Sequence, residues 1–221
     1  MENTALGIVA GFTGKALADG LAEEHLASDF IVLSEGNTRI NVKIEACQET
    51  EINGGGPEIS ETEFHLLITK LQNLSPSDML VLSGSAPASF STAMYRELLR
   101  TISASGALFA ADVSGEALAA ALEFRPYLIK PNRDELSALL GRKLLCESDI
   151  REAAMEIAAR GIKHVLVSLG AEGAVLATAK GEYFTVKAPR GEVCSTVGSG
   201  DALLAGFLAA LQSNSGTLRC V

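Results

Sequence analysis

The stretch YLIKPNRDELSALL, from Tyr127 to Leu140, contains the structural unit that repeats along this chain. The apolar residues Tyr127–Ile129 predict a short buried strand, and Asp134–Leu140 predicts a helix after the intervening turn. The same alternation of helix and strand extends from Ser60 to Leu211. It predicts an α/β fold with a mainly parallel sheet and helices on both faces. Ligands of such sheets bind beyond the carboxyl ends of the strands.

Further strands are predicted by short apolar runs bounded by turn residues. They fall at Ala5–Ala10, Met79–Leu82, Ala107–Ala111, His164–Leu169, Ala174–Ala177 and Tyr183–Val186. Further helices are predicted by helical periodicity and by capping residues such as the Ser60/Glu63 box. They fall at Lys15–His25, 60–74, Ser91–Ser103, Glu116–Leu122, Asp149–Arg160 and Ala202–Leu211. Between the first strand and the first helix, Gly11–Gly14 is expected to form a turn.

Residues 29–53 follow a different pattern from the rest of the chain. Polar and apolar residues alternate strictly from Arg39 to Glu45, which predicts a half-buried strand. Asp29–Leu33 and Glu49–Asn53 are candidate neighbours of this strand. We therefore expect a small antiparallel segment apart from the main sheet. Its polar face carries the hydrogen-bond donors Arg39, Asn41 and Lys43.

The composition places the chain among single-domain globular proteins. Its 221 residues fit one domain, and 48% hydrophobic residues are enough for a sizeable core. A net charge of −9 without a basic cluster argues against nucleic-acid binding, which depends on phosphate neutralisation. The sequence shows no signal peptide and no membrane-length apolar run. The four cysteines have no C-x-x-C spacing, so free thiols and a cytoplasmic location are expected.

The segment from Ser195 to Asp201 leads directly into the last apolar helix. Glycines at a helix start let the backbone approach an anion, which the free amides and the helix dipole then hold. Asp201 stands where a substrate hydroxyl would meet a phosphate. The same Gly-x-Gly-Asp pattern is also explained by a plain helix-capping turn, so both interpretations stay open here.

Three other turns follow predicted strands. In the turn that starts at Lys130, Asn132 and Glu135 are three residues apart. They could hold a hydrated Mg²⁺ or cap the next helix, and the two roles are compatible. Ser168–Gly173 is fully explained by a tight turn between strands. Ser83–Ser85 ends another strand, where α/β folds place substrate contacts.

These turns, taken together and in order, resemble those of one protein family. It is the phosphofructokinase-B branch of the ribokinase-like sugar kinases, and the 1-phosphofructokinases are the most similar group within it. The resemblance covers Ala5 to Leu211. The segments that carry it are Gly11–Gly14, Thr38–Lys43, Gly56–Ile59, Leu82–Ser85, Lys130–Asn132, Val167–Gly173 and Thr196–Asp201.

The resemblance implies a role for each turn. Asp201 would be the catalytic base, and the amides of Gly198, Ser199 and Gly200 would form the anion hole. The implied ATP-binding residues are Lys130, Asn132, Ser168, Gly170, Ala171, Glu172, Gly173 and Gly200. The implied Mg²⁺ ligands are Asn132 and Glu135. The implied sugar-phosphate contacts are Arg39, Lys43, Ser83, Gly84 and Ser85.

The implied reaction is ATP-dependent phosphorylation of a ketohexose phosphate, with fructose 1-phosphate as the first candidate. Tagatose 6-phosphate and fructose 6-phosphate are alternatives, and so is a catalytically inactive fragment. The family has a substrate Asp and a Gly-Gly turn before the position of Ala5, and further helices beyond Leu211. We therefore expect a chain truncated at both ends, with little or no sugar kinase activity. In this family the segment that corresponds to residues 29–53 is a small β lid, and such lids often pair between subunits. A homodimer through residues 29–53 is therefore also expected.

Overall fold

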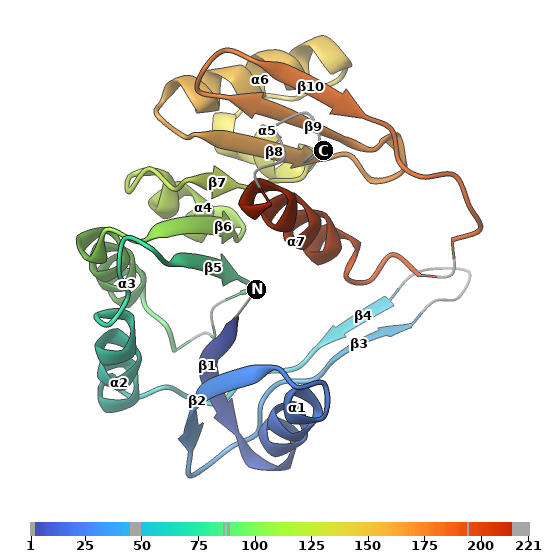
Figure 1. The fold of residues 1–221 in the computed structure, drawn as a ribbon. Coiled ribbons are helices and arrows are strands. Elements are labelled where there is room, and N and C mark those ends of the chain that lie inside the picture. Colours follow the sequence, from blue (N-terminus) through green and yellow to red (C-terminus); the bar gives the residue numbers. More distant parts are fainter. Residues whose placement is uncertain (1–2, 45–49, 86, 88, 194, 214–221) are drawn as a thin grey trace. The chain divides into compact units, whose positions relative to one another are not determined.

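The computed structural model describes residues 3–44, 50–85, 87, 89–193 and 195–213, with only the backbone at 43, 50 and 51 (Figure 1). The chain divides into two compact units. The first unit comprises Met1–Ser75 and Ala86–Gly106, and the second comprises Pro76–Ser85 and Ala107–Val221. Each unit is described separately below.

The second unit is built on a six-stranded sheet in the order β10-β9-β8-β7-β6-β5. Its strands are β5 (Met79–Ser83), β6 (Leu108–Asp112), β7 (Leu128–Ile129), β8 (His164–Ser168), β9 (Ala174–Thr178) and β10 (Tyr183–Val186). Strands β5 to β8 are parallel, and β9 and β10 continue the sheet antiparallel. The predicted strands are confirmed with nearly the predicted bounds, and so is the mainly parallel sheet.

Helices cover both faces of this sheet (Figure 1). They are α4 (Gly115–Leu122), α5 (Arg133–Leu140), α6 (Glu147–Ala159) and α7 (Ser199–Gln212). Successive side chains of a strand point to opposite faces. Leu128 of β7 and Leu166 of β8 pack in one cluster with Phe207 of α7, so their side chains lie on the face that α7 covers. Helix α6 contacts β8 and β9 and buries Ile150 and Ile157.

Strand β5 differs from its prediction as a buried strand. It is the last strand in the sheet order, and Val81 remains 43% exposed in the structure. Leu108 on the neighbouring β6 is equally exposed, at 43%. An apolar run gives the same sequence signal in a central strand and in an edge strand, because only the strand order decides which residues are covered.

The first unit contains a parallel strand pair and three helices. β1 (Thr4–Ala10) and β2 (Ala27–Leu33) are parallel and are joined by α1 (Gly11–Glu23). Helices α2 (Glu61–Leu71) and α3 (Thr92–Ser105) contact each other. The predicted caps are confirmed: Ser60 forms a capping box with Glu63, and the Ser91 hydroxyl accepts from the Met94 amide. Ring contacts of Phe90 with Phe64 and Tyr95 pack α2 and α3 together.

The helix after β1 starts earlier than predicted. Gly11–Gly14 forms the first turn of α1 rather than a separate turn. Gly11 has φ +60°, a conformation that glycine adopts at little cost. A Cβ at Gly14 would lie 2.9 Å from the Val9 side chain, so this glycine allows helix and strand to approach closely. The two glycines serve the β1–α1 junction, which the pattern of turn residues alone does not distinguish from a loop.

The antiparallel pair predicted in residues 29–53 is confirmed only in its second half. β3 (Asn41–Ile44) pairs with β4 (Thr50–Asn53) as a separate two-stranded sheet. The proposed neighbour Asp29–Leu33 is wrong, because these residues belong to β2 and pair with β1. The reason is burial: Ile31 and Leu33 pack with Ala10 and with Leu67 of α2. The paired strands themselves, residues 41–44 and 50–53, are called the β3–β4 hairpin below.

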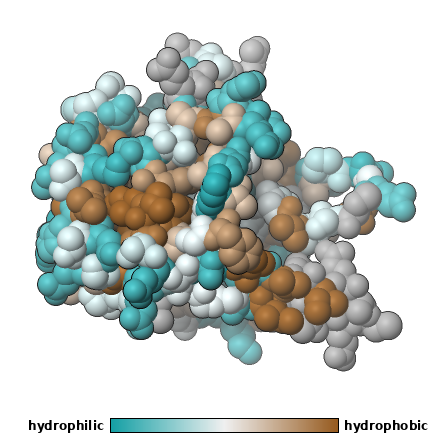
Figure 2. All heavy atoms as spheres, turned by 90° about the horizontal axis from the view of Figure 1, so that it is seen from below, coloured by the Kyte–Doolittle hydropathy of each residue, from teal (hydrophilic) through white to brown (hydrophobic). Residues whose placement is uncertain are grey.

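The apolar residues of the β3–β4 hairpin are not buried in the single chain. Val42, Ile44 and Ile52 are 46%, 45% and 56% exposed, so the prediction of a half-buried strand is wrong for the isolated chain. The first unit also exposes Phe12 and Val32, at 74% and 75%. Figure 2 shows hydrophobic residues gathered in patches on one face of the molecule. Alternation along a strand indicates two distinct faces, but it does not show what covers the apolar one.

Among the helices of the described ranges, none combines the length and the apolar composition that crossing a bilayer requires.

Candidate active site

Four parallel strands of the second unit end in polar residues at the same edge of the sheet. Ser83 ends β5, Asp112 ends β6, Lys130 follows β7 and Ser168 ends β8. Backbone hydrogen bonds hold these ends in register. The Gly84 amide donates to the Asp112 carbonyl (3.3 Å), and the Lys130 amide donates to the Ala111 carbonyl (3.1 Å). This edge is where α/β sheets bind ligands.

Helix α7 begins without a capping side chain. Its N-cap, Gly198, is in the left-handed conformation (φ 76°, ψ −1°). Ser199, Gly200 and Asp201 form the first turn, and the Asp201 side chain is exposed. The first amides of a helix have no partners within the helix and carry its positive dipole end. This geometry suits an anion, and the roles predicted for the four residues stay predictions.

The Lys130 ammonium lies beside this first turn. Lys130 is only 8% exposed, and its Nζ lies 3.0 Å from Oδ1 of Asp112. A Cβ built on Gly200 would lie 3.1 Å from the same Nζ. The structure therefore brings together Lys130 and the start of α7, which are far apart in the sequence. It also adds Asp112, which the sequence reasoning missed, although a carboxylate directly after the apolar run Leu108–Ala111 was a usable signal.

The turn after Lys130 caps helix α5. Oδ1 of Asn132 accepts from the Glu135 amide, and Oε2 of Glu135 accepts from the Asn132 amide, both at 2.8 Å. The capping interpretation is thus confirmed, and a metal role for the pair stays a prediction. Within the described ranges, no three His, Cys, Asp or Glu side chains are grouped as a metal site.

The segment Ser168–Gly173 forms a turn between β8 and β9. Gly170–Glu172 is one turn of 3₁₀-helix, closed by a 2.8 Å bond from the Leu169 amide to the Gly173 carbonyl. Gly173 has φ +106°, and a Cβ there would lie 1.9 Å from the Val186 carbonyl oxygen. Arg133 and Glu172 join this turn to the start of α5 by an ion pair of 2.6 Å. Two of the predicted nucleotide segments are therefore neighbours.

The predicted sugar-phosphate contacts are divided between the two units. Ser83–Ser85 begins at the last residue of β5 in the second unit and is exposed. Arg39 belongs to the first unit and is also exposed, and the side chain of Lys43 lies outside the described part of the structure.

Thr38 anchors the backbone next to Arg39, a function that the sequence reasoning did not assign. Its Oγ1 accepts from the Ala10 amide at 2.9 Å, and its own amide donates to the Ala10 carbonyl at 2.9 Å. The Thr13 hydroxyl donates to the Thr38 carbonyl at 2.7 Å. These bonds fix the segment before β3 to the β1–α1 junction.

His164 is a core residue of the second unit, in line with the absence of ligand spacing around it. Its ring packs against Tyr127 and Phe207, with centroid distances of 5.0 and 5.5 Å. Neither ring nitrogen has a hydrogen-bond partner in the structure. Burial, assisted by the nearby charge of Lys163, lowers the pKa of His164 to about 4, so the ring is neutral at pH 7.

Comparisons with protein families and with individual proteins both point to carbohydrate kinases. The pfkB family of carbohydrate kinases matches residues 2–221. The 1-phosphofructokinase of Bacillus subtilis is 39% identical over 211 residues, which are 96% of this chain and 69% of the relative. The D-tagatose-1-phosphate kinase of Bacillus licheniformis is 37% identical over 209 residues, 94% of this chain and 68% of the relative.

A solved structure extends the agreement to the fold. Phosphofructokinase-2 from Escherichia coli, in complex with fructose-6-phosphate, superposes with a TM-score of 0.89 at 31% identity. The match covers 99% of this chain and 72% of that one. The chain therefore belongs to the pfkB family of carbohydrate kinases, with a ribokinase-like fold. The chemistry of this class is the ATP-dependent phosphorylation of sugar phosphates.

Proposed function

We propose that this chain transfers the γ-phosphoryl group of ATP to the 6-hydroxyl of fructose 1-phosphate. The observation that carries the proposal is the grouping of the Lys130 ammonium with the first turn of α7, which contains Asp201. A cation and the amides at the positive end of a helix dipole suit the charge that phosphoryl transfer spreads over the phosphate oxygens. The ketohexose phosphates named for the relatives support the class of acceptor.

The proposed mechanism gives each residue one task. Asp201 accepts the proton of the sugar hydroxyl as the hydroxyl oxygen forms a bond to the γ-phosphorus. The bond from that phosphorus to the bridging oxygen of ATP breaks, and ADP leaves. Amides of Gly198, Ser199 and Gly200 stabilise the transferring group, and Lys130 offsets its charge. Positioning and charge stabilisation supply most of the rate enhancement in such reactions.

Mg²⁺ fits the turn at Asn132 and Glu135 in its donor chemistry. The capping box engages Oδ1 of Asn132 and Oε2 of Glu135, and a carboxylate has a second oxygen. Mg²⁺ prefers oxygen ligands, keeps several waters and is often held by few protein groups together with phosphates. We propose this turn as the protein's contribution to a hydrated Mg²⁺, which would neutralise phosphate charge when it is bound.

We also propose that the β3–β4 hairpin pairs with that of a second copy. The half-exposed Val42, Ile44 and Ile52 support this, because apolar strand surface is stabilised by burial. Light scattering should give twice the chain mass, and Val42→Asp should give the single-chain mass. A monomeric parent protein would refute the pairing.

A coupled ADP-release assay tests the function. It compares fructose 1-phosphate, tagatose 6-phosphate and fructose 6-phosphate, with calorimetric titration of ATP and Mg²⁺ in parallel. Turnover of roughly 1 to 100 per second with fructose 1-phosphate would match ordinary kinases and would refute the expectation, drawn from the sequence, of little or no activity. Faster turnover of another sugar would reassign the substrate. ATP binding without turnover of any sugar would identify a nucleotide-binding protein that is not a kinase.

A further inference from the structure

The carboxylate of Asp112 and the ammonium of Lys130 form a nearly buried ion pair in the second unit. The two side chains are 16% and 9% exposed, and the nitrogen–oxygen distance is 3.0 Å. By contrast, Arg133 and Glu172 are 34% and 66% exposed in their ion pair. Exposed ion pairs contribute little to folding stability. Breaking a buried pair is costly, because it leaves one charge buried without a partner. The Asp112–Lys130 pair should therefore strongly restrict where the ammonium lies.

The backbone places the two residues side by side. In the register of β6 and β7, Ala111 is the partner of Ile129, so Asp112 and Lys130 each follow directly after the last pair. The Lys130 amide donates to the Ala111 carbonyl, and the Asp112 carbonyl accepts from the Gly84 amide. The main chain is thus fixed on both sides of the pair, and only the side chains remain to be oriented.

The other neighbour of the ammonium is the start of α7. The space that a Cβ of Gly200 would take lies 3.1 Å from Nζ of Lys130. A Cβ at position 200 would require the ammonium to move by a few tenths of an ångström. A long, flexible lysine has many rotamers, and pairing with Asp112 selects those that lie close to this turn.

We propose that Asp112 is a positioning residue that holds the Lys130 ammonium against the first turn of α7, where the ammonium meets the phosphates of ATP. The inference rests on the proposed function for the identity of the anion. Its geometric part, that Asp112 determines where the ammonium lies, is independent of any ligand. Asp112 acts through Lys130 and does not contact the nucleotide.

The geometric part is tested by NMR without nucleotide. The wild-type chain should show a nuclear Overhauser effect between the Lys130 ε-protons and the Gly200 α-protons. Asp112→Asn, which keeps the shape but removes the charge, should weaken or abolish it, and Asp112→Glu should restore it in part. Asp29→Asn, which breaks the Lys70–Asp29 pair in the first unit, is the matched control and should leave it unchanged. An undiminished effect in Asp112→Asn overturns the proposal.

The functional part is tested by a double-mutant cycle on ATP affinity. Asp112→Asn and Lys130→Met should each weaken ATP binding roughly tenfold or more. The double variant should bind ATP no more weakly than the Lys130→Met variant, because the two residues act as a unit. The double variant contains neither charge, so it avoids the unpaired buried charge that could unfold a single variant. Adenosine, which has no phosphate, should bind all variants equally.

Other outcomes separate the two proposals. Tighter ATP binding by Asp112→Asn would show that Asp112 masks the lysine and would overturn the positioning role. Further weakening by Asp112→Asn in the Lys130→Met background would overturn it too, because Asp112 would then act on the ligand directly. If the wild-type chain binds no ATP, the kinase proposal fails, while the NMR comparison still decides whether Asp112 positions Lys130.

Discussion

At the scale of single residues, Asp201 is the most direct test of the proposed chemistry. Its carboxylate is exposed in the first turn of α7. We expect Asp201→Asn to reduce turnover about 10²- to 10⁴-fold, because a general base is lost. ATP affinity should change little, since the backbone amides remain. Asp134→Asn, an acidic residue in the first turn of α5, is the control. Near wild-type turnover of Asp201→Asn would exclude the base role.

Gly173 is a residue whose conformation and surroundings both require glycine. It has φ +106°, and an added Cβ would lie 1.9 Å from the Val186 carbonyl oxygen. Gly173→Ala should therefore destabilise the chain by more than about 1 kcal/mol, measured by urea denaturation, and should weaken ATP binding. Gly181 is the matched control, with φ +83° and open space around its Cβ position. Equal losses for both alanine variants would show that backbone strain alone matters.

At the scale of elements, His164 links strand β8 to helix α7 and makes their packing sensitive to pH. Its pKa is lowered to about 4 by burial, below the ordinary value of 6.5, so the unfolded chain binds the proton more tightly. Stability should accordingly be complete above about pH 6.5 and be lost as the pH falls toward 4, by up to about 3 kcal/mol. Denaturation curves of wild type and His164→Phe across this range measure it. An identical pH dependence in the two proteins would contradict the assignment.

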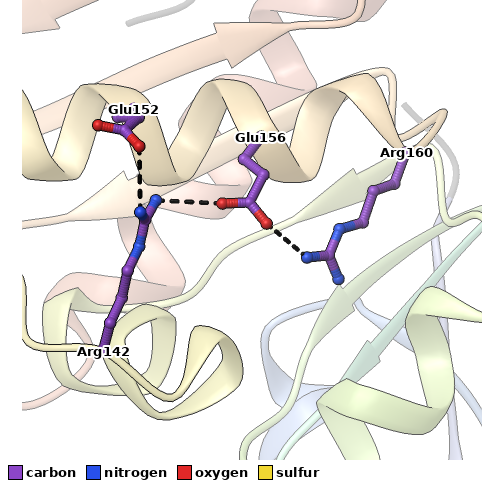
Figure 3. A network of polar contacts seen from close by, with 4 residues as sticks. All are labelled: Arg142, Glu152, Glu156 and Arg160. Atoms are coloured by element: carbon purple, nitrogen blue, oxygen red, sulfur yellow. Dashed lines mark hydrogen bonds and ion pairs between the residues drawn. The ribbon is translucent and has the colours of Figure 1, made fainter.

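An ion network joins the loop after α5 to helix α6, and we expect it to contribute little to the stability of the fold. Arg142 contacts Glu152 and Glu156, and Glu156 also pairs with Arg160, at distances from 2.7 to 3.1 Å (Figure 3). All four side chains are at least 41% exposed. Glu156→Gln should lower the free energy of unfolding by less than about 1 kcal/mol, and salt should reduce the difference. A loss several times larger, or one that is insensitive to salt, would show that the network is effectively buried.

At the scale of the whole molecule, the sequence was informative where local signals and burial agree. The capping boxes at Ser60 and Asn132 and the strands of the second unit were predictable, because a helix cap and a buried strand each have their own pattern. The pairing of Asp29–Leu33 was not, because two apolar strands do not show which partner each has. Asp112 became a site residue only through its partner Lys130, and contacts across a sheet are not visible along the chain.

The last prediction concerns the distribution of stability over the molecule. In the second unit the central strands are fully covered: Leu128, Ile129, Val165 and Leu166 are each 0% exposed. In the first unit the strand pair is covered less completely, and Val32 of β2 is 75% exposed. Local opening is governed by buried apolar contacts, so amides of β7 and β8 should exchange with solvent most slowly, and those of β1 and β2 faster.

Native-state hydrogen exchange under mild denaturant measures this difference directly. Amides of β7 and β8 should show the free energy of global unfolding, and those of β1 and β2 a smaller value that belongs to partial opening. ATP should raise the protection of amides at the start of α7 and leave β2 unaffected, because stabilisation by a ligand acts on states that bind it. Equal protection of β1 and β8 without ATP would show that both units unfold in one cooperative step, and the inferred hierarchy of stability would be wrong.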